Sequence, residues 1–301
     1  MVLVYKYRSN ILDGKNEYRQ DTVSLLSGEF FAAPFTCLND PFEASVELPM
    51  SKDDEHWVTP IKQKIYDVGI YSLAKPKDNE LFPDNELMWA HYANSHKGFC
   101  IEYDLDKLTE CIENKVFDTR NVIRVHYDVN SPIITEYDDI FSVQRKIFGT
   151  KSKPWEYENE VRLVFETNGI KLIKRGAIKS IYFGLNIGFD EWKAIIDGLN
   201  GKGIDFYQIV RVGQLYKLEC VKLDLNFKYE IVSTRHNKVV ENYTILYTSQ
   251  NKDKNSMLLF IKQLRYRFQR PANFTIIDNI SANRVLNDYK PRSLLNMDEI
   301  L

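Results

Sequence analysis

Two glutamates and an arginine stand at alternate positions in one short segment of this chain. Residues 153–165 read Lys-Pro-Trp-Glu-Tyr-Glu-Asn-Glu-Val-Arg-Leu-Val-Phe. If residues 158–165 form a strand, its side chains alternate between two faces, and Glu158, Glu160 and Arg162 share one face. Neighbouring carboxylates repel each other and raise a pKa, whereas the guanidinium opposes that shift and orients a charged carboxylate. An oriented carboxylate in a cleft can bind a sugar hydroxyl or stabilise an oxocarbenium-like transition state. The alternative is a half-buried strand whose polar face is only solvated.

A second group of polar side chains surrounds a proline turn. Residues 35–43 read Phe-Thr-Cys-Leu-Asn-Asp-Pro-Phe-Glu, which brings Asn39, Asp40 and Glu43 together. Asx side chains bind their own backbone and proline fixes the next φ angle, so we expect a turn at residues 39–41. This turn is a candidate loop of the functional site.

Aromatic and histidine side chains gather in residues 87–98. The segment reads Leu-Met-Trp-Ala-His-Tyr-Ala-Asn-Ser-His-Lys-Gly, and we expect a helix over residues 85–95. Core packing explains Trp89 and Tyr92, which are neighbours at helical spacing. His91 is either a satisfied core histidine or a ligand contact. His91 and His96 lie about 140° apart around a helix, so they are not a metal-ligand pair, and no metal is expected.

Motifs of the common nucleotide and hydrolase sites are absent. The chain has no G-x-G-x-x-G after a strand, no G-x-x-x-x-G-K-[ST] and no G-x-S-x-G. Its four cysteines include no Cys-x-x-Cys pair that would begin a zinc or redox site. Kinase, P-loop, Rossmann and zinc-hydrolase interpretations are therefore disfavoured. A hydrolytic triad stays open, because its members are scattered in sequence.

Length and charge set wider bounds. The 301 residues carry 40 basic and 42 acidic side chains, a net charge of −2. At roughly 150 residues per domain this length predicts about two domains. The electrostatic field of so small a net charge does not draw the whole molecule to nucleic acid or an anionic membrane. No apolar run approaches the ~20 residues of a membrane span, and the first residues lack signal-peptide features. We therefore expect a cytoplasmic protein without a membrane partner.

The charge is unevenly distributed. Residues 1–204 hold 25 basic and 32 acidic side chains, a net of −7, which leaves 15 basic and 10 acidic, a net of +5, for residues 205–301. We expect one domain over residues 1–204, with a candidate catalytic cleft, and a basic extension over residues 205–301.

The element pattern favours an α+β fold. Strands are expected at residues 2–7, 71–73, 99–103, 122–127, 158–165 and 180–183, with a helix over 190–199 capped by Asp190. Because the strands lack a strict βαβ rhythm, we expect mixed, mostly antiparallel strands with interspersed helices. A small β-α-β unit follows from about residue 240, with strands at 243–247 and 274–277 and a helix at 255–269.

That last helix suggests a further contact surface. Its apolar positions form one stripe, while its basic side chains are Lys262, Arg265, Arg267 and Arg270. Such a helix is either a docked surface helix with a solvated basic face or a contact for nucleic acid or a protein partner.

Five sequence blocks stand in order along residues 1–200. They are Tyr5-Lys-Tyr-Arg-Ser9, Leu38-Asn-Asp-Pro-Phe-Glu43, Met88-Trp-Ala-His-Tyr92 with Gly98-Phe-Cys-Ile-Glu-Tyr103, Trp155-Glu-Tyr-Glu-Asn-Glu-Val-Arg162, and Ile181-Tyr-Phe-Gly184. Together they resemble the bacterial and phage family called domain of unknown function 2971. That setting implies a toxin or a phage-defence effector. The last hundred residues lie outside the resemblance.

The succession of strands is also similar to ADP-ribosyltransferases, in which the last Glu of a Glu-x-Glu motif holds a ribose hydroxyl of NAD. The resemblance implies that Glu160 is the catalytic Glu and Glu158 its partner, and that Tyr7, Arg8 or Ser9 contacts NAD. Ser72 matches the serine of the middle strand, and His91 or Tyr92 is expected at the nicotinamide. NAD is then the substrate and an unidentified protein or nucleic acid the acceptor. The chain departs from that pattern in having no His-Gly-Thr triplet after its first strand.

Three functions remain open from the sequence. The first is an NAD-consuming enzyme, either an ADP-ribosyltransferase or an NAD glycohydrolase. The second is a non-enzymatic module that binds a nucleotide or a peptide in an aromatic-rich cleft. The third is a nucleic-acid-directed effector that uses the basic C-terminal helix.

Overall fold

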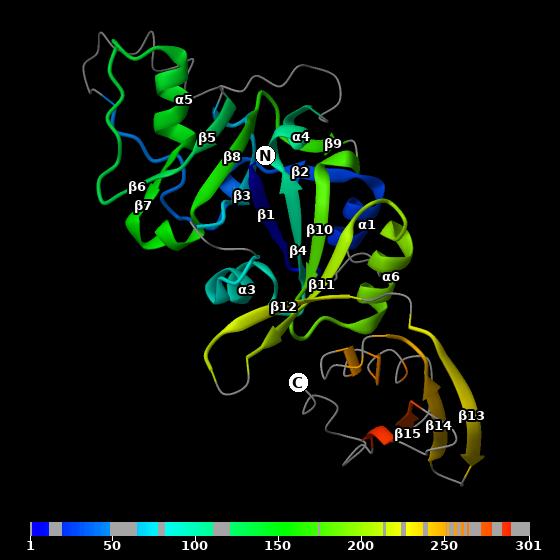
Figure 1. The fold of residues 1–301 in the computed structure, drawn as a ribbon. Coiled ribbons are helices and arrows are strands. Elements are labelled where there is room, and N and C mark those ends of the chain that lie inside the picture. The colour runs from blue at the N-terminus through cyan, green and yellow to red at the C-terminus, as the bar shows by residue number, and fades with distance from the viewer. Residues whose placement is uncertain are drawn as a thin grey trace. The chain divides into compact units, whose positions relative to one another are not determined.

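The computed structural model divides the chain into two compact units, Met1–Asp205 and Phe206–Leu301. The residues it describes are 2–11, 20–48, 65–77, 82–110, 121–173, 175–212, 215–223, 227–236, 240–250, 252, 256–257, 260–261, 264, 272–278 and 285–289. The division falls one residue after the boundary expected from the charge distribution. Helices are interspersed among mostly antiparallel strands (Figure 1), so the predicted α+β class is confirmed.

The first unit is built on strands that run in the order β10-β4-β1-β3-β8-β5, each antiparallel to its neighbour. Their bounds are β1 (Leu3–Arg8), β3 (Gly69–Ala74), β4 (Phe99–Asp104), β5 (Val122–Arg124), β8 (Glu160–Phe165) and β10 (Ile178–Phe183). β1 has the β-branched and aromatic sequence of a strand, and it lies between β4 and β3 with strands on both sides.

The sheet opens between β1 and β3. β1 pairs with β4 at six successive positions, and β3 pairs with β8 at six. Between β1 and β3 the register has a single pair, Tyr5 with Ala74. The residues that follow Tyr5 on β1 and precede Ala74 on β3 are therefore left without a full ladder between them, and side chains from both strands are available to a site there.

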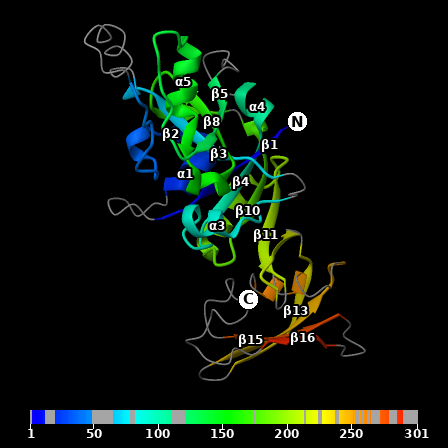
Figure 2. The same ribbon diagram turned by 90° about the vertical axis from the view of Figure 1, so that its left-hand side faces the viewer.

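Helices and short elements surround this sheet. They are α1 (Gln20–Ser27), α3 (Glu86–Tyr92), α4 (Leu105–Glu110), α5 (Ile140–Phe148), α6 (Phe189–Leu199), β2 (Glu29–Ala32), β6 (His126–Asp128), β7 (Thr150–Ser152), β9 (Gly169–Leu172) and the 3₁₀ turns η1 (Phe35–Cys37), η4 (Lys153–Glu158) and η5 (Arg175–Ala177). β2 pairs with β9 antiparallel, and β6 pairs with β7 in parallel. Both Figure 1 and Figure 2 show α5 beside β5 and β8.

Two helix ends differ from expectation. α3 stops at Tyr92, three residues before the predicted end, because the backbone at Asn94, Ser95 and His96 is left-handed, with φ angles of 47°, 52° and 66°. α6 is capped by Gly188, so Asp190 lies inside the first turn and is not the predicted cap. Its negative charge still suits the helix N-terminus.

An apolar cluster fixes the far end of β8. α5 buries Val143, Ile147 and Phe148 against Ile70 of β3 and Val164 of β8. Each such side chain contributes about 1.5–3 kcal/mol relative to an exposed position. This packing holds β8 firmly next to the residues that carry the candidate site.

The second unit contains an antiparallel pair and a separate four-stranded sheet. The pair is β11 (Asp205–Arg211), which begins at the boundary, with β12 (Leu218–Lys222). The sheet has the order β13 (Tyr229–His236), β14 (Glu241–Tyr247), β15 (Ala272–Ile277) and β16 (Val285–Tyr289). β14 and β15 are parallel, and helical positions between them are buried at Met257, Phe260, Ile261 and Leu264. The predicted C-terminal β-α-β unit is confirmed.

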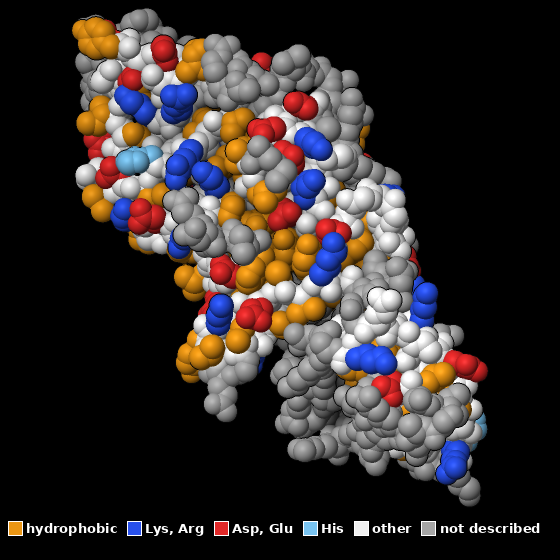
Figure 3. Space-filling model, viewed as in Figure 1, with side chains coloured by type: hydrophobic (Ala, Val, Ile, Leu, Met, Phe, Trp, Pro, Cys, Tyr) orange, Lys and Arg blue, Asp and Glu red, His pale blue; other side chains and the backbone are white. Residues whose placement is uncertain are grey.

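The basic surface expected on that helix is not observed directly. Lys262, Arg265, Arg267 and Arg270 lie outside the described residues. On the face shown in Figure 3, basic and acidic side chains of the described residues are interspersed.

Candidate functional site

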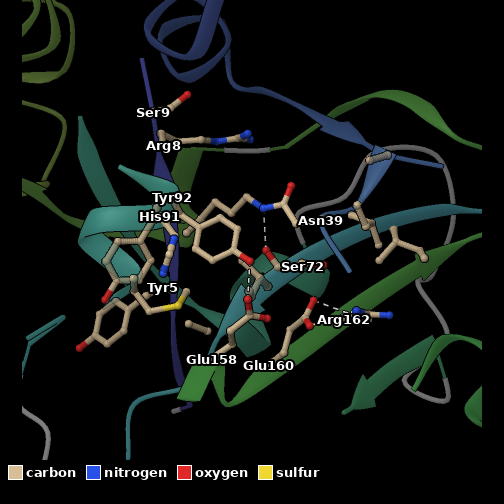
Figure 4. A pocket seen from close by; sticks show the side chains of 18 of the residues that line it. Tyr5, Arg8, Ser9, Asn39, Ser72, His91, Tyr92, Glu158, Glu160 and Arg162 are labelled. Carbon is tan, nitrogen blue, oxygen red and sulfur yellow. Dashed lines mark hydrogen bonds and ion pairs between the residues drawn. The ribbon is translucent and has the colours of Figure 1, made fainter. Parts of the chain in front are cut away.

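A pocket of about 520 Å³ lies where β1 and β3 separate (Figure 4). Its volume falls within the usual range for small-molecule sites. Its lining includes the residues expected at the site: Tyr7, Arg8, Ser9, Asn39, Ser72, His91, Tyr92, Glu158, Glu160 and Arg162. Asp40 and Glu43 do not line it but bind residues next to it or within its wall. Figure 4 shows Arg8 and Ser9 at one end and Glu158, Glu160 and Arg162 at the other.

The two carboxylates reach the pocket differently from the prediction. The strand begins at Glu160, whereas Glu158 is the last residue of η4, and Asn159 between them is left-handed with φ 45°. Asn159 is held by Lys75: its side-chain nitrogen donates to the Lys75 oxygen and its own oxygen accepts from the Lys75 nitrogen, both at 2.8 Å. The prediction of a continuous strand beginning at residue 158 was therefore wrong. The turn exists because backbone pairing to the end of β3 fixes residue 159.

Arg162 joins two carboxylates from distant parts of the chain. Its side chain is 0% exposed, so the alternative of a merely solvated polar face does not hold at this residue. Its Nε and Nη2 donate to Glu160 at 2.9 and 3.0 Å. Nη1 and Nη2 donate to both oxygens of Glu43, the second at 2.9 Å. Burial opposes ionisation of Glu160, but the charges of Arg162 and Lys151 outweigh it and lower its pKa to about 2. Glu160 is thus a fixed, charged carboxylate.

Glu158 has a different environment. Lys151 Nζ donates to its Oε2 at 2.6 Å and lies 3.5 Å from an oxygen of Glu160. The Tyr92 hydroxyl donates to its other oxygen. Burial raises the pKa of Glu158, Lys151 opposes that rise, and the neighbouring Glu160 adds to it. The pair of carboxylates therefore has opposite pKa shifts, a pattern that is common in acid–base sites.

The turn at residues 39–43 positions Glu43. Asp40 is 3% exposed, accepts from the Phe42 nitrogen at 2.9 Å, and accepts from the Ser152 hydroxyl at 3.3 Å. This is the expected Asx turn, and it also ties the loop to β7. Glu43, 9% exposed, then reaches Arg162, while Asn39 lines the pocket.

α3 supplies the aromatic wall. Its N-cap Asn85 accepts from the Leu87 and Met88 nitrogens and donates to the Tyr157 oxygen at 2.9 Å, which sets α3 against η4. Trp89 is 0% exposed and packs edge-on against the Tyr7 ring, with centroids 5.2 Å apart, as core packing predicted. His91 is exposed at the pocket, so it is not a core histidine.

The other end of the pocket contains charged side chains that were not predicted from the sequence. Asp21 of α1 lies 3.5 Å from Arg8 and accepts from the Asn10 nitrogen at 2.8 Å. Lys6 lines the pocket and donates to the Ser72 oxygen at 2.8 Å. Lys151 was missed as well. For Lys6 the only signal was its position between two tyrosines of a strand; Asp21 and Lys151 gave none.

Comparison with known proteins adds one finding. Residues 88–163 match the family model described as "Protein of unknown function (DUF2971)". Those residues are similar to this family, and the similarity covers about a quarter of the 301-residue chain. The DUF2971 segment begins on α3, ends in β8, and so contains Tyr92, Lys151, Glu158, Glu160 and Arg162. The match is narrower than the expected residues 1–200 and leaves β1 outside. No curated protein and no solved structure matches the chain significantly.

Two kinds of feature are absent from the described residues. Within them, no group of three His, Cys, Asp or Glu side chains is arranged to hold a metal ion. No helix in that part of the chain has the length and apolar character needed to cross a membrane.

Proposed function

We propose that the first unit is an NAD-consuming enzyme, an ADP-ribosyltransferase or an NAD glycohydrolase, with the pocket between β1 and β3 as its active site. The observation that carries this proposal is the charge polarity of the pocket. NAD has a cationic nicotinamide ring and an anionic diphosphate, so a site for it needs opposite charges at its two ends.

The carboxylate end has an excess of negative charge. Glu43, Glu158 and Glu160 bind Arg162 and Lys151 there, so three carboxylates and two cations sum to −1 when all are ionised. As the bond to nicotinamide breaks, positive charge moves onto the ribose, and a preorganised negative environment stabilises that transition state. Glu160 is charged and fixed in orientation by Arg162, which suits this role.

The opposite end has an excess of positive charge. Arg8 and Lys6 face a single carboxylate, Asp21, so the sum there is +1 when Lys6 is protonated. Arginine and lysine beside a serine hydroxyl, that of Ser9, suit a diphosphate. The rings of His91 and Tyr92 also line the pocket, and Tyr92 contacts Glu158, so these rings are our candidates for contact with nicotinamide at the carboxylate end.

One observation favours a second function. Both oxygens of Glu158 and both oxygens of Glu160 already accept hydrogen bonds from the chain itself. A site whose carboxylate oxygens all have hydrogen-bond partners within the chain would also suit a module that binds a nucleotide or a peptide without turning it over. Such a module is stabilised against heat by its ligand but releases no nicotinamide.

The deciding experiment measures nicotinamide release from NAD by the purified chain, with and without cell extract as a source of acceptor. Glu160→Gln should lower the rate by about 10²–10⁴, because removing one group that stabilises transition-state charge costs about 3–5 kcal/mol of barrier. Glu156→Gln is the matched control, since the Glu156 side chain is 58% exposed and pairs with Lys153 on the same turn. Glu158→Gln serves as a second variant if Glu160→Gln unfolds.

The outcomes separate the functions. Nicotinamide release that is lost in Glu160→Gln and kept in Glu156→Gln supports the enzyme, and label transferred to a macromolecule identifies a transferase. No release by the wild type at any protein concentration would falsify the enzyme proposal. A toxin or phage-defence role predicts that expression slows growth and that Glu160→Gln relieves the effect.

The nucleic-acid surface at Lys262, Arg265, Arg267 and Arg270 stays a prediction, which charge reversal at Arg265 and Arg267 would test at low salt.

A further inference from the structure

Lys6 differs from the other cations that line the pocket. Arg8, Lys151 and Arg162 each have a carboxylate partner within 3.5 Å. Lys6 Nζ instead donates to the Ser72 backbone oxygen at 2.8 Å and lies 4.9 Å from the centre of the Tyr71 ring. Among the described residues, no carboxylate lies within ion-pair distance of Lys6 Nζ. Its ammonium group is therefore available to an anion that enters the pocket.

The charges around Lys6 come from several elements. Burial disfavours its charged form, and Arg8 on the same strand adds repulsion; Glu160 of β8, Asp21 of α1 and Glu158 of η4 oppose these effects. The sum lowers the pKa of Lys6 to about 7. Tyr71 on β3 lies against Lys6, and Cys100 on β4 is close enough to feel its charge, but burial raises the pKa of both groups, so both are neutral at physiological pH.

We infer that Lys6, Arg8 and the Ser9 hydroxyl form an anion site for the diphosphate diester of a dinucleotide, and that Lys6 takes up a proton from solvent when this ligand binds. The inference rests on the proposed function, because it names the part of NAD that this end of the pocket would hold.

Geometry favours a diphosphate over a single anion. Lys6 and Arg8 are two residues apart on one strand, so their side chains leave the same face about 6–7 Å apart. Two phosphates joined by one oxygen can meet both cations. The Ser9 hydroxyl lies beside them in the pocket lining and donates to Asp21 Oδ2 at 3.4 Å, a bond that an entering phosphate would replace. Arg8 is already partly neutralised by Asp21, so a dianion needs the second cation.

Proton uptake follows from electrostatics. An anion placed against a buried amine favours its charged form and raises its pKa. In the empty pocket Lys6 is about half protonated near pH 7; in the complex it would be fully protonated. Binding and protonation are then linked, and the affinity must fall as pH rises through the pKa of the empty site.

The test is calorimetric titration with ADP-ribose between about pH 6 and 9, in two buffers of different protonation enthalpy. ADP-ribose has the diphosphate diester, which does not titrate in this range, and it lacks the bond that the enzyme would break. For the wild type we expect constant affinity below about pH 7 and a loss of about tenfold per pH unit above it. Proton uptake should rise from about 0.1 at pH 6 to about 0.9 at pH 8, from a pKa of about 7.

Three variants complete the test. Lys6→Arg keeps a permanent charge, so its affinity should stay high and lose its pH dependence. Lys6→Met should bind about tenfold or more weakly at pH 6 and show no proton uptake. Lys97→Met, at an exposed lysine that does not line the pocket, should behave as the wild type.

The binding of ADP-ribose and the cleavage of NAD are measured separately, so the anion site and the proposed enzyme can fail independently. If ADP-ribose binds with this pH dependence but NAD is never cleaved, the anion site stands and the proposed enzyme fails. If NAD is cleaved but ADP-ribose binds independently of pH, binds equally well to Lys6→Met, or does not bind at all, the inference is overturned. If Lys6→Met unfolds, a pH dependence that persists in Lys6→Arg would overturn it as well.

Discussion

Replacing Arg162 with methionine tests the electrostatic centre of the site. The substitution removes a fully buried guanidinium from between Glu43 and Glu160, whose side chains are only 3% and 5% exposed. Breaking a buried ion pair from one side costs about 3–5 kcal/mol, because a charge is left without compensation. Methionine is long and apolar, so it leaves little cavity. We therefore expect Arg162→Met to lower the free energy of unfolding by about 3–5 kcal/mol at pH 7, a large part of the total stability of a domain.

The loss should depend on pH with a definite sign. In the wild type the pKa of Glu160 is about 2, below its ordinary value of 4.5, so its contribution is present above pH 4.5 and lost as pH falls through 2. Without Arg162, burial dominates and raises the pKa of Glu160 above its ordinary value. Its contribution is then lost as pH rises through that raised pKa. The difference between wild type and variant should therefore be largest at about pH 8 and shrink toward about pH 5.

Urea unfolding followed by tryptophan fluorescence is the assay. All four tryptophans lie in the first unit, so the signal reports that unit. Lys193→Met is the control, because its pair with Asp197 is 55% and 60% exposed and such pairs contribute at most about 0.5 kcal/mol. The triple variant E43Q/E160Q/R162M, which removes all three charges, should recover part of the loss. A loss under about 1 kcal/mol, or a loss equal at pH 5 and pH 8, would show that Arg162 does not compensate the charges of Glu43 and Glu160.

Two other substitutions probe the packing of the sheet at Gly98 and the environment of Glu158. Gly98→Ala would drive a Cβ into the Arg8 backbone oxygen, so we expect a loss of more than about 2 kcal/mol in the same unfolding assay. Gly176→Ala is its control, since nothing lies within 4 Å of the added Cβ, and a change beyond about 0.5 kcal/mol would contradict this. Tyr92→Phe removes a donor to Glu158, so the pKa of Glu158 should rise further in a carbon-13 NMR titration. An unchanged titration would contradict that contact.

Local signals in the sequence were enough to predict most of the elements. Asn85 before an apolar helical stretch predicts a capped helix, and the β-branched and aromatic residues near Val161 predict a strand. Both signals depend on neighbours within about one helical turn or one strand, which the sequence displays directly. The same locality explains the errors at Ser95 and Asp190, where the exact helix end depends on backbone turns and packing beyond the helix.

Residue types and spacing also predicted the chemistry at Glu158, Glu160 and Arg162. The sequence did not show that Glu43 shares Arg162 with Glu160, across 119 positions of the chain, or that Lys151 lies between the two glutamates. Nor did it single out Lys6, an unremarkable lysine until its burial in the pocket is known.

Propensity, capping and alternation are local properties, so the order of residues specifies which side chains are available and on which element each stands. Which of these side chains meet depends on long-range packing. The opening of the sheet between β1 and β3 depends on how distant strands pair, and the partners and pKa values of the pocket residues depend on burial. Burial and long-range charge contacts exist only once the chain has closed on itself, so no local pattern can record them.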